Sequence, residues 1–139
     1  LYNGYAVYDP RELCPSGWRV PFDEDWMNLE VTLGMSEVEV TQSGGRGTDE
    51  GAKLKTTFGW WSDGNGTGES GFSALPGGYR QGQTIAVSKN AGSGGYWWCA
   101  SPFEDESWFR YLYFDTDQIN REIVQLTYGF SIRCIKDSE

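Results

Sequence analysis

The side chains that usually carry out enzymatic chemistry are sparse in this chain of 139 residues. The chain has no histidine, which removes Ser-His-Asp catalysis, Cys-His catalysis and histidine-bound metal ions. Asp115 and Asp117 are spaced for one side of a strand, where two carboxylates could act as an acid and a base. Such pairs are more often a solvated strand edge. We therefore predict that the chain is not an enzyme and has no catalytic residue.

Metal binding is the second chemistry that the residue types suggest. The segment Asp63–Glu69 places oxygen-bearing side chains at alternate positions, as a calcium loop would. An EF-hand would also need a carboxylate at its twelfth position, which is Ala74 here. A tight glycine-rich turn accounts for the same residues without an ion. We predict no metal ion and no other cofactor.

The three cysteines offer a third kind of chemistry. Cys14 and Cys134 lie near opposite ends of the chain, and Cys99 follows two tryptophans. A Cys14–Cys134 bridge would close almost the whole chain, which entropy models value at roughly 4 to 5 kcal/mol. The alternative is three reduced, buried thiols. We favour the bridge, and we expect Cys99 to be a small buried residue rather than a reactive thiol.

Charge and hydropathy narrow the range of partners. The formal net charge is −9, from 20 acidic and 11 basic residues, which opposes binding to nucleic acid and to anionic lipid. No apolar run approaches the roughly 20 residues that span a bilayer. We predict that the chain binds no nucleic acid and does not insert directly into a membrane.

Composition and length bound the architecture. A chain of 139 residues suits one domain, and we predict a single domain over residues 1–139. Aromatic residues make up 16% of the chain, and 19 residues are glycine. Large rings should therefore fill the core, and this much glycine argues against a helical bundle.

Periodicity places helices early in the chain. Asp23 is suited to cap a helix that contains Trp26, Leu29 and Leu33 and ends at Gly34. A second, short helix is expected over residues 50–55, and Leu1 to Val7 has the apolar and aromatic pattern of a strand.

Strand patterns dominate the last third. Alternation predicts strands over residues 96–100, 108–113, 119–126 and 128–135, joined as an antiparallel meander. Trp97 and Trp98 should point to opposite faces of this sheet, so that only one of them lies in the core. The predicted class is α+β, with helices early and an antiparallel sheet late.

Several motifs give the chain a family resemblance. It resembles the Fibrobacter succinogenes major paralogous domain, found in many secreted or lipid-anchored bacterial surface proteins. The matching segments are 1–7, 13–18 with 20–21, 71–80, 96–98 and 129–134. The resemblance implies a C-type-lectin-like fold, related to formylglycine-generating enzyme domains, with two helices packed on small twisted antiparallel sheets. It also implies that the termini lie together, which makes Cys14 and Cys134 natural disulfide partners.

The same resemblance suggests a diversified binding segment over about 96–130, because lectin-like domains of this type are targets of diversity-generating retroelements. Landmarks would be retained at Trp97, Trp98, Trp108, Arg110, Leu112, Gly129 and Phe130. The predicted ligand-binding residues lie between them: Phe103, Glu104, Asp105, Tyr113, Asp115, Thr116, Asp117, Gln118, Asn120, Glu122, Val124 and Gln125. Their mixture of rings, amides and carboxylates suits adaptable recognition. The alternative is that these are ordinary solvent-facing positions.

These observations lead to one functional expectation and three alternatives. We expect a non-catalytic ligand-binding domain of a bacterial or phage-associated surface protein, located outside the cell or on its surface. Its partner would be a cell-surface protein or glycan bound through residues 103–125. The alternatives are a fixed glycan-binding module of a secreted protein, with Trp98 and Trp108 as a sugar-stacking platform; a formylglycine-type oxidase using Cys99 and a second thiol; and a spacer domain.

Overall fold

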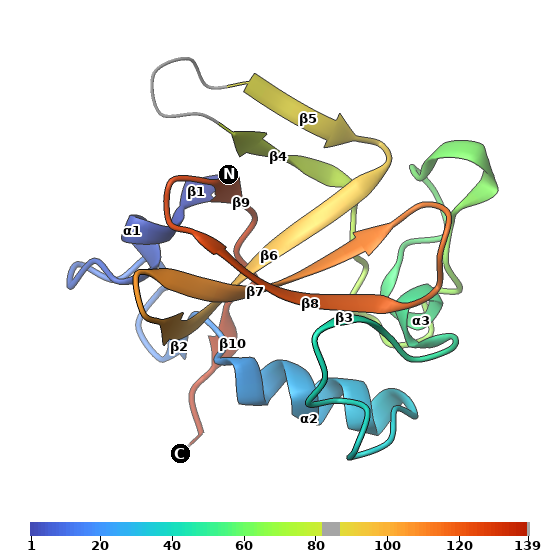
Figure 1. The fold of residues 1–139 in the computed structure, drawn as a ribbon, viewed down its shortest axis with the longest axis horizontal. Helices are drawn as coiled ribbons and strands as arrows, with labels where there is room; N and C mark the ends of the chain where they lie inside the picture. The colour runs from blue at the N-terminus through green and yellow to red at the C-terminus, as the bar shows by residue number, and fades with distance from the viewer. Residues whose placement is uncertain (82–86, 139) are drawn as a thin grey trace.

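A computed structural model describes residues 1–81 and 87–138 as an α+β fold (Figure 1). The helices are α1 (Gly4–Val7), α2 (Asp23–Leu33) and α3 (Glu50–Leu54), with a 3-10 turn at Trp61–Asp63. The strands are β1 (Tyr2–Asn3), β2 (Trp18–Arg19), β3 (Gly44–Arg46), β4 (Gly77–Gln81), β5 (Val87–Ala91), β6 (Gly94–Phe103), β7 (Glu106–Tyr113), β8 (Ile119–Gln125), β9 (Gly129–Phe130) and β10 (Ile135–Lys136).

The long helix α2 confirms the expected helix, with one difference at its start. Phe22 is the residue that caps it, and its backbone N–H donates to the Asp25 carboxylate at 2.7 Å. Gly34 ends the helix with a φ of 126°, which favours glycine. Asp23 was expected to be the cap. It is instead the first helical residue, and its buried carboxylate faces the sheet.

The first seven residues do not form one strand. Only Tyr2 and Asn3 pair as β1, and Gly4–Val7 is the helical turn α1. The Asn3 side chain accepts a hydrogen bond from the Ala6 N–H at 3.1 Å, so a polar cap at this position favours a turn over an extended strand.

The main sheet is mixed rather than purely antiparallel. Its strand order is β1-β9-β4-β6-β7-β8-β3, with β5 paired to β4, and β4 meets β6 in parallel at Gly78 and Gly95. The expected meander therefore holds through β8 but not for the last strand. The free edge of β8 is taken by β3, so the chain crosses the sheet and β9 pairs with β1 and β4.

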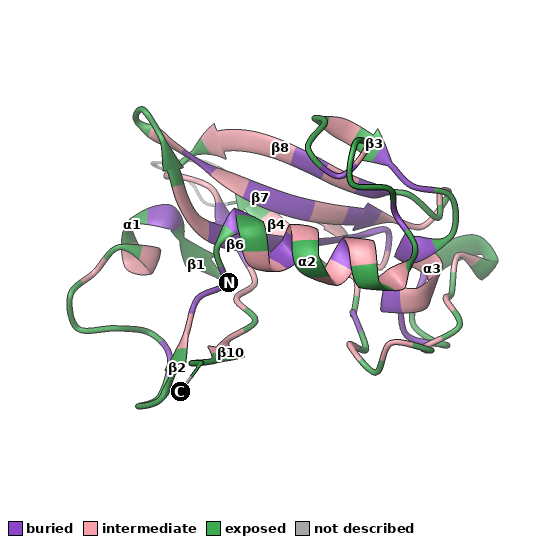
Figure 2. Cartoon of the chain, turned by 90° about the horizontal axis from the view of Figure 1, so that it is seen from below, coloured by how far each residue is buried: buried purple, intermediate pink, exposed green. Residues whose placement is uncertain are grey.

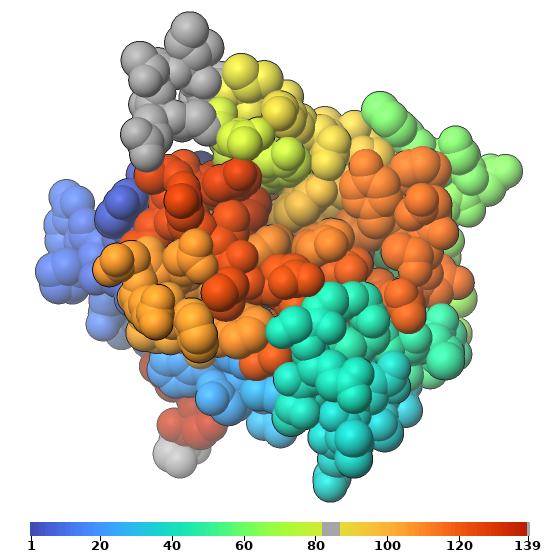
Figure 3. All heavy atoms as spheres, viewed as in Figure 1, coloured from blue at the N-terminus to red at the C-terminus, as the bar shows by residue number. Residues whose placement is uncertain are grey.

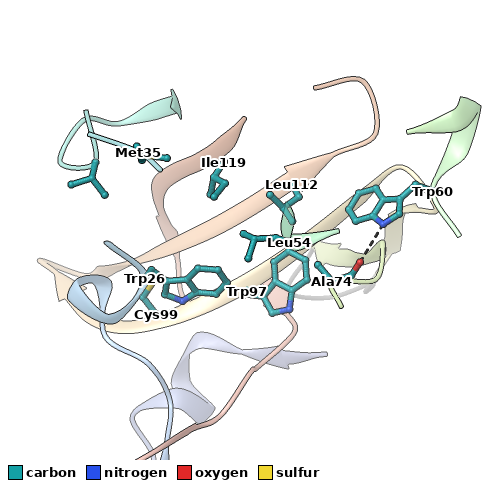
Figure 4. Packing of buried hydrophobic residues seen from close by; sticks show 10 residues of the cluster. Trp26, Met35, Leu54, Trp60, Ala74, Trp97, Cys99, Leu112 and Ile119 are labelled. Atoms are coloured by element: carbon teal, nitrogen blue, oxygen red, sulfur yellow. Dashed lines mark hydrogen bonds between the residues drawn. The ribbon is translucent and has the colours of Figure 1, made fainter. Parts of the chain in front are cut away.

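Both tryptophans of β6 are buried. Trp97 is 6% exposed and lies in the cluster under α2, together with Trp26 and Leu112 (Figure 4). Trp98 is 0% exposed and packs against Phe130 on the other face. The two residues do point to opposite faces, as expected. The expectation that only one lies in the core was wrong, because an aromatic cluster fills the second face.

β2 and β10 form a two-stranded ribbon beside the N-terminal end of α2 (Figures 1 and 2). Cys14 and Cys134, separated by 120 positions, form a disulfide there, as predicted. The expectation that the termini lie together is wrong, because β1 at the start of the chain pairs with β9 in the main sheet, away from β10 (Figure 1). In the described residues, no helix is long and apolar enough to cross a membrane.

Candidate functional site

A buried ion network holds the sheet on α2 and so fixes the strands that carry the candidate site. Arg110 of β7 donates to Glu30 at 2.6 Å and to Asp23 at 2.7 Å, and both acids come from α2. Arg121 of β8 forms a second contact to Asp23 at 2.6 Å, and Arg46 of β3 reaches Glu30 at 2.8 Å. Three neighbouring strands are thereby tied to one helix.

Asp23 is the centre of this network electrostatically. Burial alone would raise the pKa of its carboxyl, but the hydrogen bonds and charges of Arg121 and Arg110 outweigh burial and hold the pKa below its ordinary value. The carboxylate is therefore charged at neutral pH, so the ion pairs stay formed.

The opposite face of the sheet presents a row of tyrosines, which we call the tyrosine ladder: Tyr128, Tyr79, Tyr96 and Tyr111. These rings follow the strand order from β9 through β4 and β6 to β7. Successive centroids are 6.0, 4.9 and 5.5 Å apart. The first and last of these contacts are stacked. All but Tyr96 are partly exposed, so the ladder offers ring surface to solvent.

Hydrogen bonds hold the ladder from β4 and β5. Gln81 donates to the Tyr128 hydroxyl at 3.0 Å, and Asn90 donates to the Tyr96 hydroxyl at 2.9 Å. Burial raises the pKa of Tyr96, and burial together with the charge of Glu122 raises the pKa of Tyr111. The hydroxyls of Tyr96 and Tyr111 therefore remain protonated donors near neutral pH.

The ladder depends on a glycine in β6. A Cβ atom at Gly94 would lie 2.8 Å from the Tyr96 ring and 3.2 Å from the Tyr113 ring. These separations are shorter than ordinary van der Waals contact. Gly94 therefore lets two tyrosines close over the strand backbone.

None of the twelve predicted ligand-binding residues is buried. Asn120, Glu122 and Val124 lie on the ladder side of β8, opposite Tyr111, Phe109 and Ser107 in the strand register. Tyr113 ends β7 on the same side. These four and the tyrosine ladder together form what we call the binding face. Figure 3 shows β7, β8 and their loop, in orange to red, on one continuous surface with the yellow atoms of β5 and β6.

The remaining eight predicted residues lie at the two ends of the β7–β8 hairpin. Glu104 and Asp105 form the exposed turn between β6 and β7, next to Phe103 at the end of β6, and Gln125 pairs with Glu106 close to that turn. The Phe103 ring contacts Trp108, with centroids 6.1 Å apart, so it lies on the helix side of the sheet, away from the ladder.

The other end is the loop of Asp115, Thr116, Asp117 and Gln118. Lys55, fully buried beneath it, donates to the Thr116 carbonyl at 2.7 Å and lies 3.9 Å from Asp117. Burial lowers the pKa of Lys55, and the nearby aspartates offset part of that shift. The Gly51 N–H also donates to the Asp117 carbonyl at 2.7 Å. The loop is thus attached to α3 at two points.

The proposed sugar-stacking pair does not form a platform. Trp98 is fully buried and donates its indole N–H to the Tyr2 carbonyl at 2.8 Å. One face of Trp108 is covered by Arg121, whose guanidinium carbon is 3.7 Å from a ring centroid. Arg110 is fully engaged with the buried carboxylates of Asp23 and Glu30. Arg133 contacts the Phe72 ring at 4.6 Å and has no ion pair within the described residues.

The sequence interpretation missed all four ladder tyrosines and Asn90. Tyr96 and Tyr111 lie in strands that were predicted, β6 and β7, so the two-residue alternation of these strands could have found them. Tyr79 and Tyr128 reach the same face from β4 and from the residues before β9. No local pattern shows that these segments lie beside β6, because the pairing is set by the crossover of the chain.

Cys99 is an unreactive core residue. It is fully buried, and burial raises the pKa of its thiol to about 12. Because Cys14 and Cys134 are bonded to each other, Cys99 has no second free thiol to act with.

These features define a disulfide-closed α+β domain whose landmark residues, apart from the partly buried Trp108, form a buried frame and whose open sheet face is aromatic. The chain belongs to the Fibrobacter succinogenes major domain family, whose model matches residues 1–136. This confirms the resemblance seen in the sequence motifs. No curated protein and no solved structure matches the chain.

Proposed function

We propose that the chain is a non-catalytic, C-type-lectin-like recognition domain of a bacterial or phage-associated surface protein. It binds a cell-surface protein or glycan through the binding face, with the adjoining hairpin ends as its rim. The disulfide suits an oxidising compartment, which agrees with a place outside the cell or on its surface.

The contrast in burial between landmarks and predicted contact residues carries this proposal. Six of the seven landmarks are buried, and Trp108 is the partly buried exception, whereas none of the twelve predicted contact residues is buried. Changes at the twelve positions would therefore alter the surface without removing core packing. This division suits a diversified receptor that keeps one frame and varies its contacts.

The chemistry of the binding face favours recognition over catalysis. Tyrosines supply large contact area at low entropic cost and an oriented hydroxyl, and they are enriched in adaptable binding surfaces. Asn120 and Glu122 add an amide and a carboxylate for hydrogen bonds. The oxidase alternative has less support because Cys99 is buried and alone. A fixed glycan ligand would use the ladder rings, since Trp98 is inaccessible.

Arrays of glycans and of bacterial surface proteins, probed with the labelled domain, test this proposal. Glu122→Lys reverses a charge on the binding face, and Glu24→Lys makes the same change on the exposed side of α2. A ligand bound as proposed should lose about tenfold or more in affinity with the first variant and stay within twofold with the second. If the two variants lower the affinity equally, or if no ligand distinguishes one variant from the other, the proposed binding face is contradicted.

Diversification is tested separately by deep sequencing of codons 95–134 across the source population. Substitutions should concentrate at the twelve predicted positions and spare the landmark tryptophan, arginine and glycine codons. An even spread of changes would favour a fixed ligand instead.

A further inference from the structure

A row of side-chain oxygen atoms lies along β8, where this strand pairs with the edge strand β3 (Figure 1). Gln118, Asn120 and Glu122 are spaced two residues apart, so their side chains extend from the same side of the chain. That side also carries the tyrosine ladder, because Asn120 lies opposite Tyr111 in the strand register. We call these three side chains the acceptor row.

Two glycines of β3 leave the acceptor row open. Gly45 is exposed and lies opposite Asn120 in the register. A Cβ atom at Gly45 would lie 2.6 Å from Oε1 of Gln118 and 3.2 Å from Oδ1 of Asn120. A Cβ atom at Gly44 would lie 3.8 Å from Oε1 of Glu122. The three oxygens therefore lie beside bare strand backbone, and no side chain at these two positions separates them from solvent.

The protein orients both amides of the row so that they present oxygen. Nδ2 of Asn120 donates to the Tyr111 carbonyl at 3.4 Å, and Nε2 of Gln118 donates to the Gly47 carbonyl at 3.3 Å. Their side-chain oxygens accept no hydrogen bond from a described residue. The Glu122 carboxylate is partly buried, and it too has neither a hydrogen bond nor an ion pair in the part of the chain that the structure describes. The row thus consists of three acceptors without a donor.

The charge around the acceptor row is negative. The twelve predicted contact residues include five acidic residues and no basic one. The arginines of β3, β7 and β8 lie in the ion network on the helix side of the sheet. Lys55 is fully buried beneath the 115–118 loop, and Lys89 lies at another edge of the sheet, on β5, where it donates to Gln81. A ligand with positive charge and several donors complements this surface.

We propose that the acceptor row binds an arginine side chain of a protein partner. This inference rests on the proposed function and names the chemistry of its partner. A guanidinium is planar and has five N–H donors, so it can donate to the Glu122 carboxylate and to the amide oxygens together. Its flat face can lie on the partly exposed Tyr111 ring. A neutral sugar would supply donors but would leave the carboxylate charge without a counter-charge.

The probe for this site is the capped tripeptide acetyl-Gly-Arg-Gly-amide, titrated into the 15N-labelled protein at about 150 mM salt, which screens distant charges. The control is the same tripeptide with citrulline, which keeps the shape of arginine but has no charge. The side-chain NH₂ resonances of Gln118 and Asn120 should shift in a saturable way with the arginine peptide. The citrulline peptide should bind about fivefold more weakly or worse. Absence of a saturable shift up to about 20 mM arginine peptide, or equal binding of the two peptides, would overturn the proposal.

A pair of charge variants locates the contact. Glu122→Gln keeps the shape of the side chain and removes its charge, so it should weaken binding of the arginine peptide about fivefold or more. Glu24→Gln makes the same change on the exposed side of α2 and should alter the affinity by less than about twofold. Equal effects of the two variants would show a general charge effect and reject the site.

A pair of glycine variants tests the site without any change of charge. Gly45→Ala places a methyl group against both amide oxygens, so it should weaken binding of the arginine peptide about fivefold or more. Gly77→Ala is the control, because the Cβ of this β4 residue would lie 3.7 Å from Oγ of Ser131, an ordinary contact. It should leave the affinity unchanged. Unchanged affinity in Gly45→Ala would overturn the site.

The array experiment separates this inference from the proposed function. A protein ligand that is weakened by Glu122→Lys and by replacement of one of its own arginines would support both. A neutral glycan weakened by Glu122→Lys would support the binding face and overturn the arginine inference. If the tripeptide binds the row but no array ligand distinguishes Glu122→Lys from Glu24→Lys, the proposed function is contradicted although the row binds a guanidinium.

Discussion

Asp23 and Glu30 accept hydrogen bonds from three arginines in the interior of this domain. Burying charge is costly unless each group is paired, and here each carboxylate has at least two arginine contacts. The geometry therefore ties strands β3, β7 and β8 to α2 at defined positions. A purely apolar contact would specify the position of these strands on α2 less strictly. The frame of the binding face therefore depends on these ion pairs.

Asp23→Asn should destabilise the domain severely. The substitution leaves Arg110 and Arg121 buried with reduced compensation, and removal of one partner from a buried pair costs about 3 to 5 kcal/mol. Urea denaturation measures the change. Asp9→Asn breaks the exposed contact between Asp9 and Arg11 and should leave the urea midpoint nearly unchanged. Similar losses in the two variants would contradict the role of the buried network.

The acid stability of the domain should depend on Asp23. Its pKa is lower in the folded chain than in the unfolded chain, so the unfolded state binds more protons once the pH falls below about 4. The stabilisation is present above that pH and is lost as the pH falls toward the folded-state value. Asp23→Asn should show a flatter decline in unfolding free energy between about pH 5 and pH 3. Identical pH profiles would refute this.

At the scale of elements, α2, α3 and the hairpin strands were predictable because their signals are local. Trp26, Leu29 and Gly34 mark a helix by spacing, and β7 shows a clean two-residue alternation. The position of β9, the mixed sheet and the short α1 were not predictable, because each depends on long-range pairing or on a single cap. Of the residues on the surface named the binding face, the sequence singled out Tyr113 and three residues of β8. The other half of this face comes from strands that meet through the crossover.

The docking of α3 under the β7–β8 loop gives a test at this scale. Alanine normally stabilises a helix relative to glycine by about 1 kcal/mol. At Gly51, however, a Cβ atom would lie 2.5 Å from the Asp117 carbonyl oxygen and 2.6 Å from that of Gln118. Gly51→Ala should therefore lower stability, and it should shift the amide resonances of residues 115–118. A stabilised protein with unchanged loop resonances would show that the loop is not held against α3.

At the scale of the whole molecule, the two faces of the sheet differ in their chemistry. The side under α2 contains the buried ion network, and the opposite side contains the tyrosine ladder. Both faces pack on buried aromatic residues of β6. A substitution on the surface of one face therefore leaves the packing of the other face unchanged. The disulfide and the β2–β10 ribbon lie beside α2, on the side of the sheet away from the tyrosine ladder.

The Cys14–Cys134 bond should therefore stabilise the domain without shaping the binding face. A closed loop of this size, with the cysteines 120 positions apart, is worth about 4 to 5 kcal/mol in the chain-entropy model. The double variant Cys14→Ser, Cys134→Ser should lower the unfolding free energy by about 2 to 5 kcal/mol.

The control is Cys99→Ala, which removes the buried free thiol and tests whether the loss of any cysteine has the same effect. It should lower the unfolding free energy less than the double variant, because only one small side chain changes. Urea unfolding with and without reductant separates the two cases: reductant should destabilise the wild type and Cys99→Ala, and it should leave the double serine variant unaffected. A wild type that is insensitive to reductant while its thiols become titratable would show that the bond does not support the fold.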